Sequence, residues 1–186
     1  MFEVNSIIRS GRRKPVWEPG AATQEVYHGR DALELILPHR DPFLLVDAIT
    51  AVDLGQMAVR GIRTLGADDP VFAGHFPGDP VYPGALMVET MAQAGATLVH
   101  FVPNATHEIG DDARIPQLRA VKYNHVAFFS EIRPGDTVTI LSRVLDPDAL
   151  TFMCAAQLWK GDTLCAFALT EGAVTDPALQ EESFAF

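Results

Sequence analysis

Hydrophobic positions are densest in the middle of the chain, where they predict one long buried helix. Residues 84–102 (GALMVETMAQAGATLVHFV) run without proline, and apolar or small side chains occupy almost every face of the expected helix. A helix at a protein surface would carry a broad charged side instead. Pro83 stands at the start of the helix, where its missing N–H costs nothing. The only polar stripe joins Glu89, Gln93 and Thr97, each four residues apart.

Strand-like patterns flank this helix on both sides. Residues 43–53 and 56–65 are rich in β-branched and apolar side chains around Leu54-Gly55, which predicts a hairpin. After a polar loop over 103–116, four more stretches are typical of strands: 117–128, 136–146, 150–159 and 163–174. Pro134-Gly135 predicts a type II turn, and Lys160-Gly161-Asp162 predicts a hairpin.

Two shorter segments complete the pattern. A short helix is expected from Arg30 to Leu37, with Asp31 available as its cap and Pro38 stopping it, whereas residues 66–84 are so rich in Gly, Pro and Asp that they predict fixed turns. A doubly wound fold would need a helix between successive strands. We therefore expect an α+β domain in which an antiparallel sheet curls around the helix. Its open edge predicts a homodimer.

Composition places the chain among globular proteins with one domain. The 186 residues are 48% hydrophobic and 20% charged, which excludes disordered, collagen-like and disulfide-scaffold classes. No apolar run reaches the ~20 residues that a bilayer requires, so no membrane insertion is expected. The first residues lack the order of a signal peptide. We expect a cytoplasmic protein in which Cys154 and Cys165 are reduced core residues.

Charge excludes a further class of function. With 14 basic and 24 acidic residues the formal net charge is −10, so we expect no nucleic-acid partner, because such binding needs a basic surface. Arg9, Arg12, Arg13 and Lys14 nevertheless gather within six positions. Residues 1–28 show no lasting periodicity, which predicts a partly ordered N-terminal extension before a single domain over 29–186. The basic segment is either a solvated arm or a docking site for anions.

Three positions in the middle of the chain have the chemistry of a site. His75 lies in a turn-rich loop, so its imidazole is either a general base or a histidine satisfied by a backbone group. For Glu89 in an apolar helix, an ionised and unpaired carboxylate would cost several kcal/mol. We expect it to be neutral, hydrogen-bonded or facing a cavity, either as a general acid or as a structural carboxyl tied to Gln93 or Thr90. The Gly84 N–H, at the helix start, either holds an oxyanion or meets water.

Four motifs, in order along the chain, resemble one enzyme family. They are PHRDPFLLVD (38–47), GHFPGDPVYPG (74–84), MVETMAQAG (87–95) and RPGD (133–136). Over roughly residues 30–175 the chain is similar to the FabZ-type 3-hydroxyacyl-[acyl carrier protein] dehydratases of fatty acid synthesis. The related FabA-type dehydratase/isomerases carry Asp where this chain has Glu89, which favours the FabZ side.

The resemblance implies a fold and an arrangement of subunits. The fold is the hotdog, in which a curved antiparallel sheet of about five to seven strands wraps a long central helix, and the assembly is a homodimer or a trimer of dimers. His75 and Glu89 are implied as the catalytic pair, supplied to each site from opposite subunits, with the Gly84 N–H holding the thioester carbonyl. His39 and Arg40 are implied to be structural.

The implied reaction is the dehydration of (3R)-hydroxyacyl thioesters to trans-2-enoyl thioesters. His75 takes the α-proton and Glu89 protonates the departing hydroxyl, so that no metal, nicotinamide or other cofactor is expected. The partner is the acyl carrier protein or CoA that bears the acyl chain. The expected substrate-binding residues are Phe76, Tyr82, Pro83, Leu86, Gln93 and Phe128, with Val88 and Met91 also lining an apolar tunnel.

Two other functions fit the same residues. A hotdog acyl thioesterase would use Glu89 to activate water, and a non-catalytic acyl-binding subunit would leave hydroxyacyl substrates unchanged. The chain departs from the family in the stretch FFSEIRPGD (128–136) and in its long N-terminal arm. An acidic carrier protein would therefore need a local basic patch. Candidates for that patch are Arg114, Arg119, Lys122 and Arg133, together with the arm.

Overall fold

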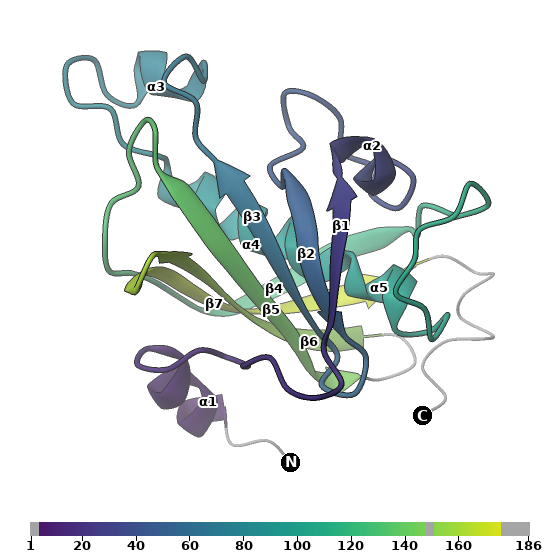
Figure 1. Cartoon of the computed structure of the whole chain (residues 1–186). Helices are drawn as coiled ribbons and strands as arrows, with labels where there is room; N and C mark the ends of the chain where they lie inside the picture. Colours follow the sequence, from purple (N-terminus) through teal and green to yellow (C-terminus); the bar gives the residue numbers. More distant parts are fainter. Residues whose placement is uncertain (1–3, 148–150, 176–186) are drawn as a thin grey trace.

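Seven antiparallel strands form one sheet in the computed structural model, which describes residues 4–147 and 151–175. The strands are β1 (Gln24–Gly29), β2 (Ala48–Asp53), β3 (Ala58–Thr64), β4 (Leu118–Phe128), β5 (Thr137–Pro147), β6 (Thr151–Lys160) and β7 (Thr163–Val174). Their order across the sheet is β1-β2-β3-β5-β6-β7-β4, which makes β1 and β4 the two edges. Figure 1 shows the sheet curling around a central helix.

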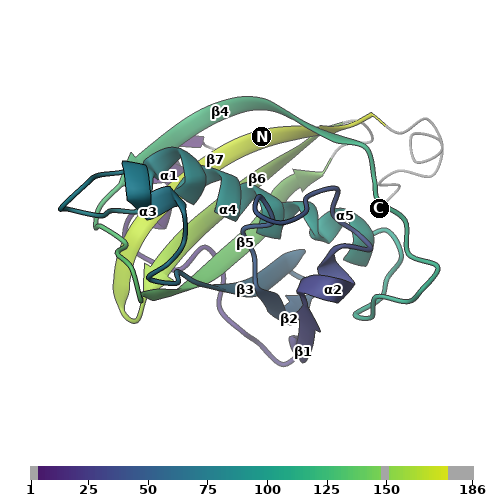
Figure 2. The ribbon, with the colours of Figure 1, turned by 90° about the horizontal axis from the view of Figure 1, so that it is seen from above.

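That helix, α4 (Gly84–Ala96), lies along the concave face of the sheet and contacts strands β3 to β7 (Figures 1 and 2). Its buried Met87, Met91 and Ala94 join the main hydrophobic core. A short helix, α5 (Leu98–Phe101), continues after Thr97, whose hydroxyl donates to the Ala94 carbonyl at 2.7 Å. The expected α+β hotdog arrangement is confirmed, although the helix expected over 84–102 is interrupted at Thr97.

The turns between the later strands follow the sequence closely. Gly135 has φ +88° and the Asp136 N–H donates to the Arg133 carbonyl at 3.0 Å, as in a type II turn. Gly161, at φ +54°, turns the hairpin between β6 and β7. Only glycine adopts such positive φ values without strain, so the two glycines fix both turns. Residue 150, expected to open the strand over 150–159, lies outside the described residues.

The first half of the sheet differs from the expected pattern in two places. Residues 24–29 form edge strand β1, although no periodicity marks them. Residues 43–47, expected to belong to a strand, instead form an irregular segment before β2, in which Leu44, Leu45 and Val46 are all buried. The Leu45 N–H is taken by Gln93 Oε1 instead of a neighbouring strand, and the strand begins only at Ala48.

Two single-turn helices lie outside the sheet, both at the upper edge of Figure 1. The helix expected over 30–37 is a single turn, α2 (Arg30–Leu33), and a second turn, α3 (Val71–Gly74), precedes the His75 loop. In the part of the chain that the structure describes, no helix is long and apolar enough to cross a membrane.

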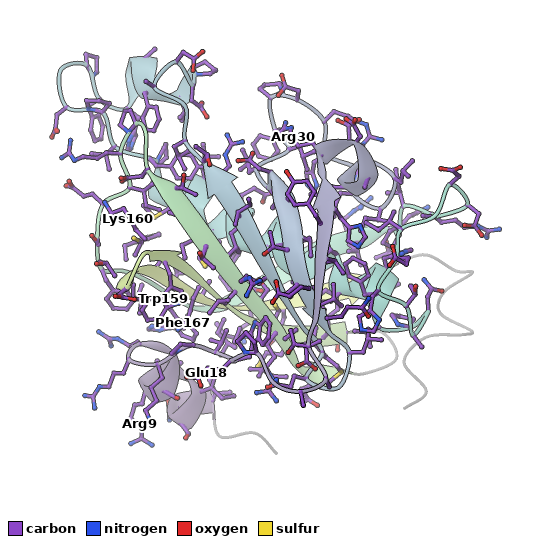
Figure 3. All side chains as sticks on the ribbon, viewed as in Figure 1. Arg9, Glu18, Arg30, Trp159, Lys160 and Phe167 are labelled. Atoms are coloured by element: carbon purple, nitrogen blue, oxygen red, sulfur yellow. The ribbon has the colours of Figure 1, made fainter. Side chains whose placement is uncertain are left out.

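The N-terminal segment packs on the outer face of the sheet. Helix α1 (Val4–Gly11) places Val4, Ile7 and Ile8 against a small cluster of Phe167, Leu169 and Ala155 (Figures 1 and 3). Trp17 is buried beside β2 and β3, and its Nε1–H donates to the Val59 carbonyl at 3.2 Å. Residues 1–3 and 176–186, which belong to the expected extension and domain, lie outside the described residues.

Candidate active site

His75 follows α3, and the loop after it is closed by its own backbone. Phe76 and Asp79 exchange two N–H···O=C hydrogen bonds of 3.3 and 3.0 Å. The Val81 N–H donates to the His75 carbonyl at 2.9 Å, and Gly78 reverses the chain at φ +84°. Apart from the single turn α3, the segment rich in Gly and Pro therefore forms fixed turns, as its composition predicts.

The turn between β4 and β5 holds this loop in place. Arg133 Nη1 donates to Asp79 Oδ1 at 2.6 Å, and the Tyr82 N–H donates to the Ile132 carbonyl at 2.7 Å. The remaining guanidinium nitrogens of Arg133 pair with the Glu131 carboxylate. The RPGD motif thus positions the GHFPGDPVYPG motif, and Arg133 has two acidic partners of its own.

The imidazole of His75 has one nitrogen engaged and one available. Its Nδ1 lies 2.8 Å from the Val81 carbonyl oxygen, which can only accept a hydrogen bond. Nδ1 therefore carries the proton and the neutral ring keeps a lone pair on Nε2. The ring stacks on Phe76 with centroids 4.0 Å apart. This is the tautomer that a general base acting through Nε2 requires.

Gly84 opens α4 directly after Pro83, whose carbonyl accepts the Met87 N–H at 3.0 Å. The N–H groups at this end have no acceptor within the helix, and the helix dipole favours negative charge there. A Cβ atom on Gly84 would lie 2.9 Å from Cζ of Phe128, so the ring of Phe128 rests directly on the glycine. The lack of a side chain lets the aromatic ring and the helix start meet.

Glu89 is hydrogen-bonded by its neighbour one turn along α4. Gln93 Nε2 donates to Glu89 Oε1 at 2.8 Å and to the Phe43 carbonyl at 2.9 Å, while Gln93 Oε1 accepts the Leu45 N–H at 2.7 Å. Gln93 is 1% exposed. This satisfied amide ties the irregular segment before β2 to the Glu89 carboxyl, so Gln93 orients Glu89.

His39 is a site residue that sequence reasoning assigned a structural role only. Its Nε2 lies 3.4 Å from Glu89 Oε1. The His39 imidazole holds the pKa of Glu89 below its ordinary value; burial acts in the opposite direction, and the hydrogen bond from Gln93 again lowers the pKa. This direction favours the ionised carboxylate over the un-ionised acid, because His39, 50 residues earlier in the chain, stabilises the charge. No local pattern in the sequence marks this contact.

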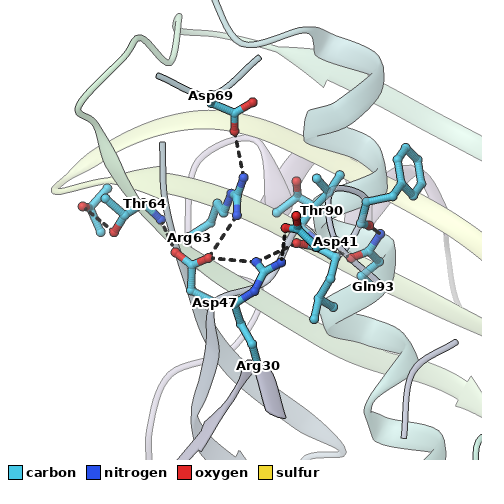
Figure 4. A network of polar contacts seen from close by, with 12 residues as sticks. Arg30, Asp41, Asp47, Arg63, Thr64, Asp69, Thr90 and Gln93 are labelled. Atoms are coloured by element: carbon cyan, nitrogen blue, oxygen red, sulfur yellow. Dashed lines mark hydrogen bonds and ion pairs between the residues drawn. The ribbon is translucent and has the colours of Figure 1, made fainter. Parts of the chain in front are cut away.

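A network of ion pairs fixes the segment that carries His39 (Figure 4). Arg63 donates to Asp47 at 3.0 Å and to Asp69 at 2.9 Å, and Arg30 donates to Asp41 at 3.1 Å. Arg30 also lies 3.5 Å from Asp47. These ion pairs join strand β3, helix α2 and the loop before α3 around the segment that carries His39.

Glu89 faces a cleft of about 170 Å³ between α4 and strands β4 and β7. Small side chains on α4 form its floor, and His39, Gln93 and Arg119 lie along it with Glu89. Both described contacts of the Glu89 carboxyl use Oε1, which leaves Oε2 for a molecule in the cleft. His75 does not line this cleft, so one protomer brings Glu89 and Gln93 together but leaves His75 elsewhere.

The other residues expected to bind substrate differ in how far they are buried. Tyr82 and Met91 belong to the core, where the Tyr82 hydroxyl lies 3.1 Å from Thr90 Oγ1. Phe76 and Phe128 are about half exposed and flank His75 and Gly84. Leu86 and Val88 are partly buried against the core.

Within residues 4–147 and 151–175, no group of three His, Cys, Asp or Glu side chains is placed to hold a metal ion.

Comparison with known proteins identifies the family of the chain. The FabA-like domain family matches residues 37–168. The FabZ 3-hydroxyacyl-[acyl-carrier-protein] dehydratase of Desulforamulus reducens is 39% identical over 138 residues, which cover 74% of this chain and 91% of the relative. The FabZ of Clostridioides difficile is 34% identical over 148 residues, which cover 76% of this chain and 96% of the relative.

Solved structures show the same fold. The dehydratase heterocomplex ApeI:P from Xenorhabdus doucetiae contains a chain with a TM-score of 0.61 and 18% identity, covering 81% of this chain and 95% of that one. The PaaI protein of E. coli has a TM-score of 0.52 and 15% sequence identity, and the match covers 72% of this chain and 81% of PaaI. Because the matched family spans well over half of the chain and the FabZ relatives match across most of their length, the chain belongs to the FabZ-type 3-hydroxyacyl-[acyl-carrier-protein] dehydratases, within the FabA-like domain family.

Proposed function

We propose that this protein is a hydro-lyase that dehydrates (3R)-hydroxyacyl thioesters to trans-2-enoyl thioesters in acyl-chain synthesis in the cytoplasm. Two side chains carry the proposal. Among the described residues, His75 uses only Nδ1 in a hydrogen bond, so its Nε2 can accept a proton, and Glu89, which lines the cleft, uses only Oε1. The names of the FabZ relatives support the same chemistry.

Edge strand β4 supports a homodimer as the working unit, either alone or within a trimer of dimers. It exposes Val121 (58%) and Tyr123 (50%) on a strand whose outer backbone groups have no neighbouring strand in the sheet. An open apolar edge of this kind favours pairing with another strand. Because β4 also lines the Glu89 cleft, a partner paired there would sit beside Glu89, and we propose that it supplies His75.

The reaction in such a shared site balances without a cofactor. Nε2 of His75 takes the α-proton, and the C–H electrons move into the thioester as the carbonyl oxygen gains negative charge. The Gly84 N–H and the helix dipole stabilise that charge. The electrons then return to form the Cα–Cβ double bond, and the C–O bond at Cβ breaks as the hydroxyl takes a proton and leaves as water.

Glu89 must hold a proton to donate it, although its pKa lies below the ordinary value in the single protomer. Burial already acts to raise this pKa. A substrate and a partner subunit that cover the cleft exclude more water, and the loss of water penalises the charged form. We propose that Oε2 takes up its proton in the closed site and passes it to the leaving hydroxyl.

An ultraviolet assay for enoyl thioester formation tests this function. Wild-type protein is mixed with matched 3-hydroxyacyl substrates on acyl carrier protein, CoA and N-acetylcysteamine, and a thiol-reactive dye runs in parallel. The dye does not report the protein itself, because burial raises the pKa of Cys154 to about 12 and also raises that of Cys165. Enoyl product without free thiol supports dehydration. Free thiol without enoyl product would show a thioesterase. If neither product appears, the protein is a non-catalytic binding subunit.

A further inference from the structure

The strongest unassigned surface is a group of four cations on the N-terminal arm. We call Arg9, Arg12, Arg13 and Lys14 the arm patch; all four are exposed. Most cations elsewhere in the sheet and loops are neutralised, as Arg30, Arg63, Arg133 and Lys160 are by carboxylates. Among the described residues, no acidic side chain pairs with the arm patch. In a chain of net charge −10, such a concentration of unpaired positive charge is unusual.

The arm patch is fixed to the sheet rather than carried on a loose tail. Buried Gln157 on β6 donates from Nε2 to the Gly11 carbonyl at 2.6 Å and to the Lys14 carbonyl at 2.8 Å, and its Oε1 accepts the Val16 N–H at 2.8 Å. A Cβ on Gly11 would overlap the ring of Phe167, so the backbone sits directly on the sheet. Figure 3 shows Phe167 beside α1 and Arg9 on the outer side of the helix.

One residue of the arm patch contacts the end of the segment that also touches the start of α4. The Arg12 guanidinium carbon is 5.6 Å from the centroid of the Phe129 ring. Phe129 follows Phe128, whose ring rests on Gly84 at the start of α4. In Figures 1 and 2, α1 lies toward the same side of the fold as α3 and the start of α4 and away from α5, but below the sheet, on the face opposite to α4. A short chain of contacts therefore links the positive surface to the candidate oxyanion donor.

We propose that the arm patch is the docking surface for the acidic carrier protein that delivers the acyl chain. This inference rests on the proposed function. A strongly acidic body repels an acidic partner, so productive encounter needs a local surface of opposite sign near the site. The arm patch supplies that surface, whereas the turn before β5 does not, because Arg133 there is paired with Asp79 and Glu131. A nucleic acid is disfavoured by the overall charge of −10.

Charge reversal tests the docking surface separately from the chemistry. The variant R12E/R13E/K14E is compared with wild type on two substrates with the same acyl chain, one on acyl carrier protein and one on uncharged N-acetylcysteamine. We expect kcat/KM to fall by at least ~10-fold on the carrier protein, mainly through KM, and by less than ~2-fold on N-acetylcysteamine. Added salt should weaken wild-type activity on the carrier protein and bring the two proteins closer together.

A matched single substitution controls for net charge. Arg13→Glu and Arg114→Glu change the charge equally, and Arg114, a rival docking candidate from the sequence, is an exposed residue of the loop between α5 and β4. Only Arg13→Glu should lower activity on the carrier protein, and thermal unfolding should be the same for both. Equal losses on the two substrates, or equal effects of the two single variants, would overturn the docking proposal. Absence of enoyl product from wild type on both substrates would instead refute the proposed dehydration.

Discussion

The contact between His39 and Glu89 shows how a single residue can escape sequence reasoning. His75, Glu89, Gln93 and Gly84 all lie within one short segment, where the residue types left alternatives open and the family resemblance implied a base, an acid and an oxyanion donor. His39 lies far from them in sequence and reaches Glu89 only because the fold brings the irregular segment before β2 against α4. Of the three alternatives expected for Glu89, the structure shows the hydrogen bond and the cavity, whereas the direction of its pKa depends on that distant partner.

Removing His39 should move the pH dependence of activity. Because the His39 imidazole lowers the pKa of Glu89, His39→Leu should raise that pKa and shift the alkaline limb of the kcat/KM profile to higher pH. His39→Gln keeps a donor and should restore part of the wild-type profile. The profile is measured on an uncharged thioester. Superimposable profiles for all three proteins would show that His39 does not act on Glu89.

Gly84 offers a paired substitution that separates its N–H from its lack of a side chain. Gly84→Pro deletes the N–H at a helix position that tolerates proline, and Pro83 already has the extended ψ of 134° that suits a following proline. Gly84→Ala keeps the N–H, and its Cβ meets the Phe128 ring just as the Cβ of proline would. We expect Gly84→Pro to lose at least ~10²-fold in kcat relative to Gly84→Ala. Equal rates for the two folded variants would remove the N–H from the mechanism.

At the scale of elements, the later strands were the most predictable part of the fold. Gly135 and Gly161 lie at turns that need a positive φ, and these turns mark where the neighbouring strands stop. Strands β4 to β7 therefore begin and end near the expected residues. Strand β1 was missed because its six residues carry little apolar pattern and join the sheet through a bulge between Glu25 and His28. The segment 43–47 was assigned to a strand wrongly, because its Leu45 N–H is taken by Gln93 instead of a neighbouring strand.

The ion-pair network around β3 should contribute more to stability than an exposed pair on the same strand. Arg63 is 11% exposed and joins Asp47 to Asp69, while Arg60 is 27% exposed and pairs with Glu25, which is 67% exposed. Arg63→Met should lower the free energy of unfolding by about 2–3 kcal/mol, because it leaves the partly buried Asp69 without a cation and Asp47 with Arg30 alone. Arg60→Met should cost about 1 kcal/mol or less. Urea denaturation measures both; equal losses would contradict the assigned role of Arg63.

For the whole molecule, the carboxyl groups predict loss of stability in acid. Burial acts to raise the pKa of Asp53, but hydrogen bonds from Thr23 and Gln56 outweigh it and hold the pKa below its ordinary value of 3.8. The pKa values of Glu89 and Asp136 are also lowered. The folded state therefore binds fewer protons than the unfolded state, so stability is full above the unfolded pKa values and falls as pH drops through the folded ones.

Urea denaturation in steps from about pH 7 to pH 3 should show this decline, with most of it below about pH 5. Asp53→Asn should be less stable than wild type at neutral pH and should depend less on pH, because the lowered pKa is removed. An unfolding midpoint that stays level or rises toward pH 3 would contradict the assignment.

The central claim is that His75 of one subunit and Glu89 of the other act on the same substrate. The most direct measurement mixes two inactive proteins, His75→Ala and Glu89→Gln, after subunit exchange. In a mixed dimer built with shared sites, one site carries both substitutions and the other carries neither, so each mixed dimer should recover about half of the wild-type turnover. If both groups acted within one chain, every site would lack one of them, and a mixture with no recovered activity despite proven subunit exchange would contradict the account.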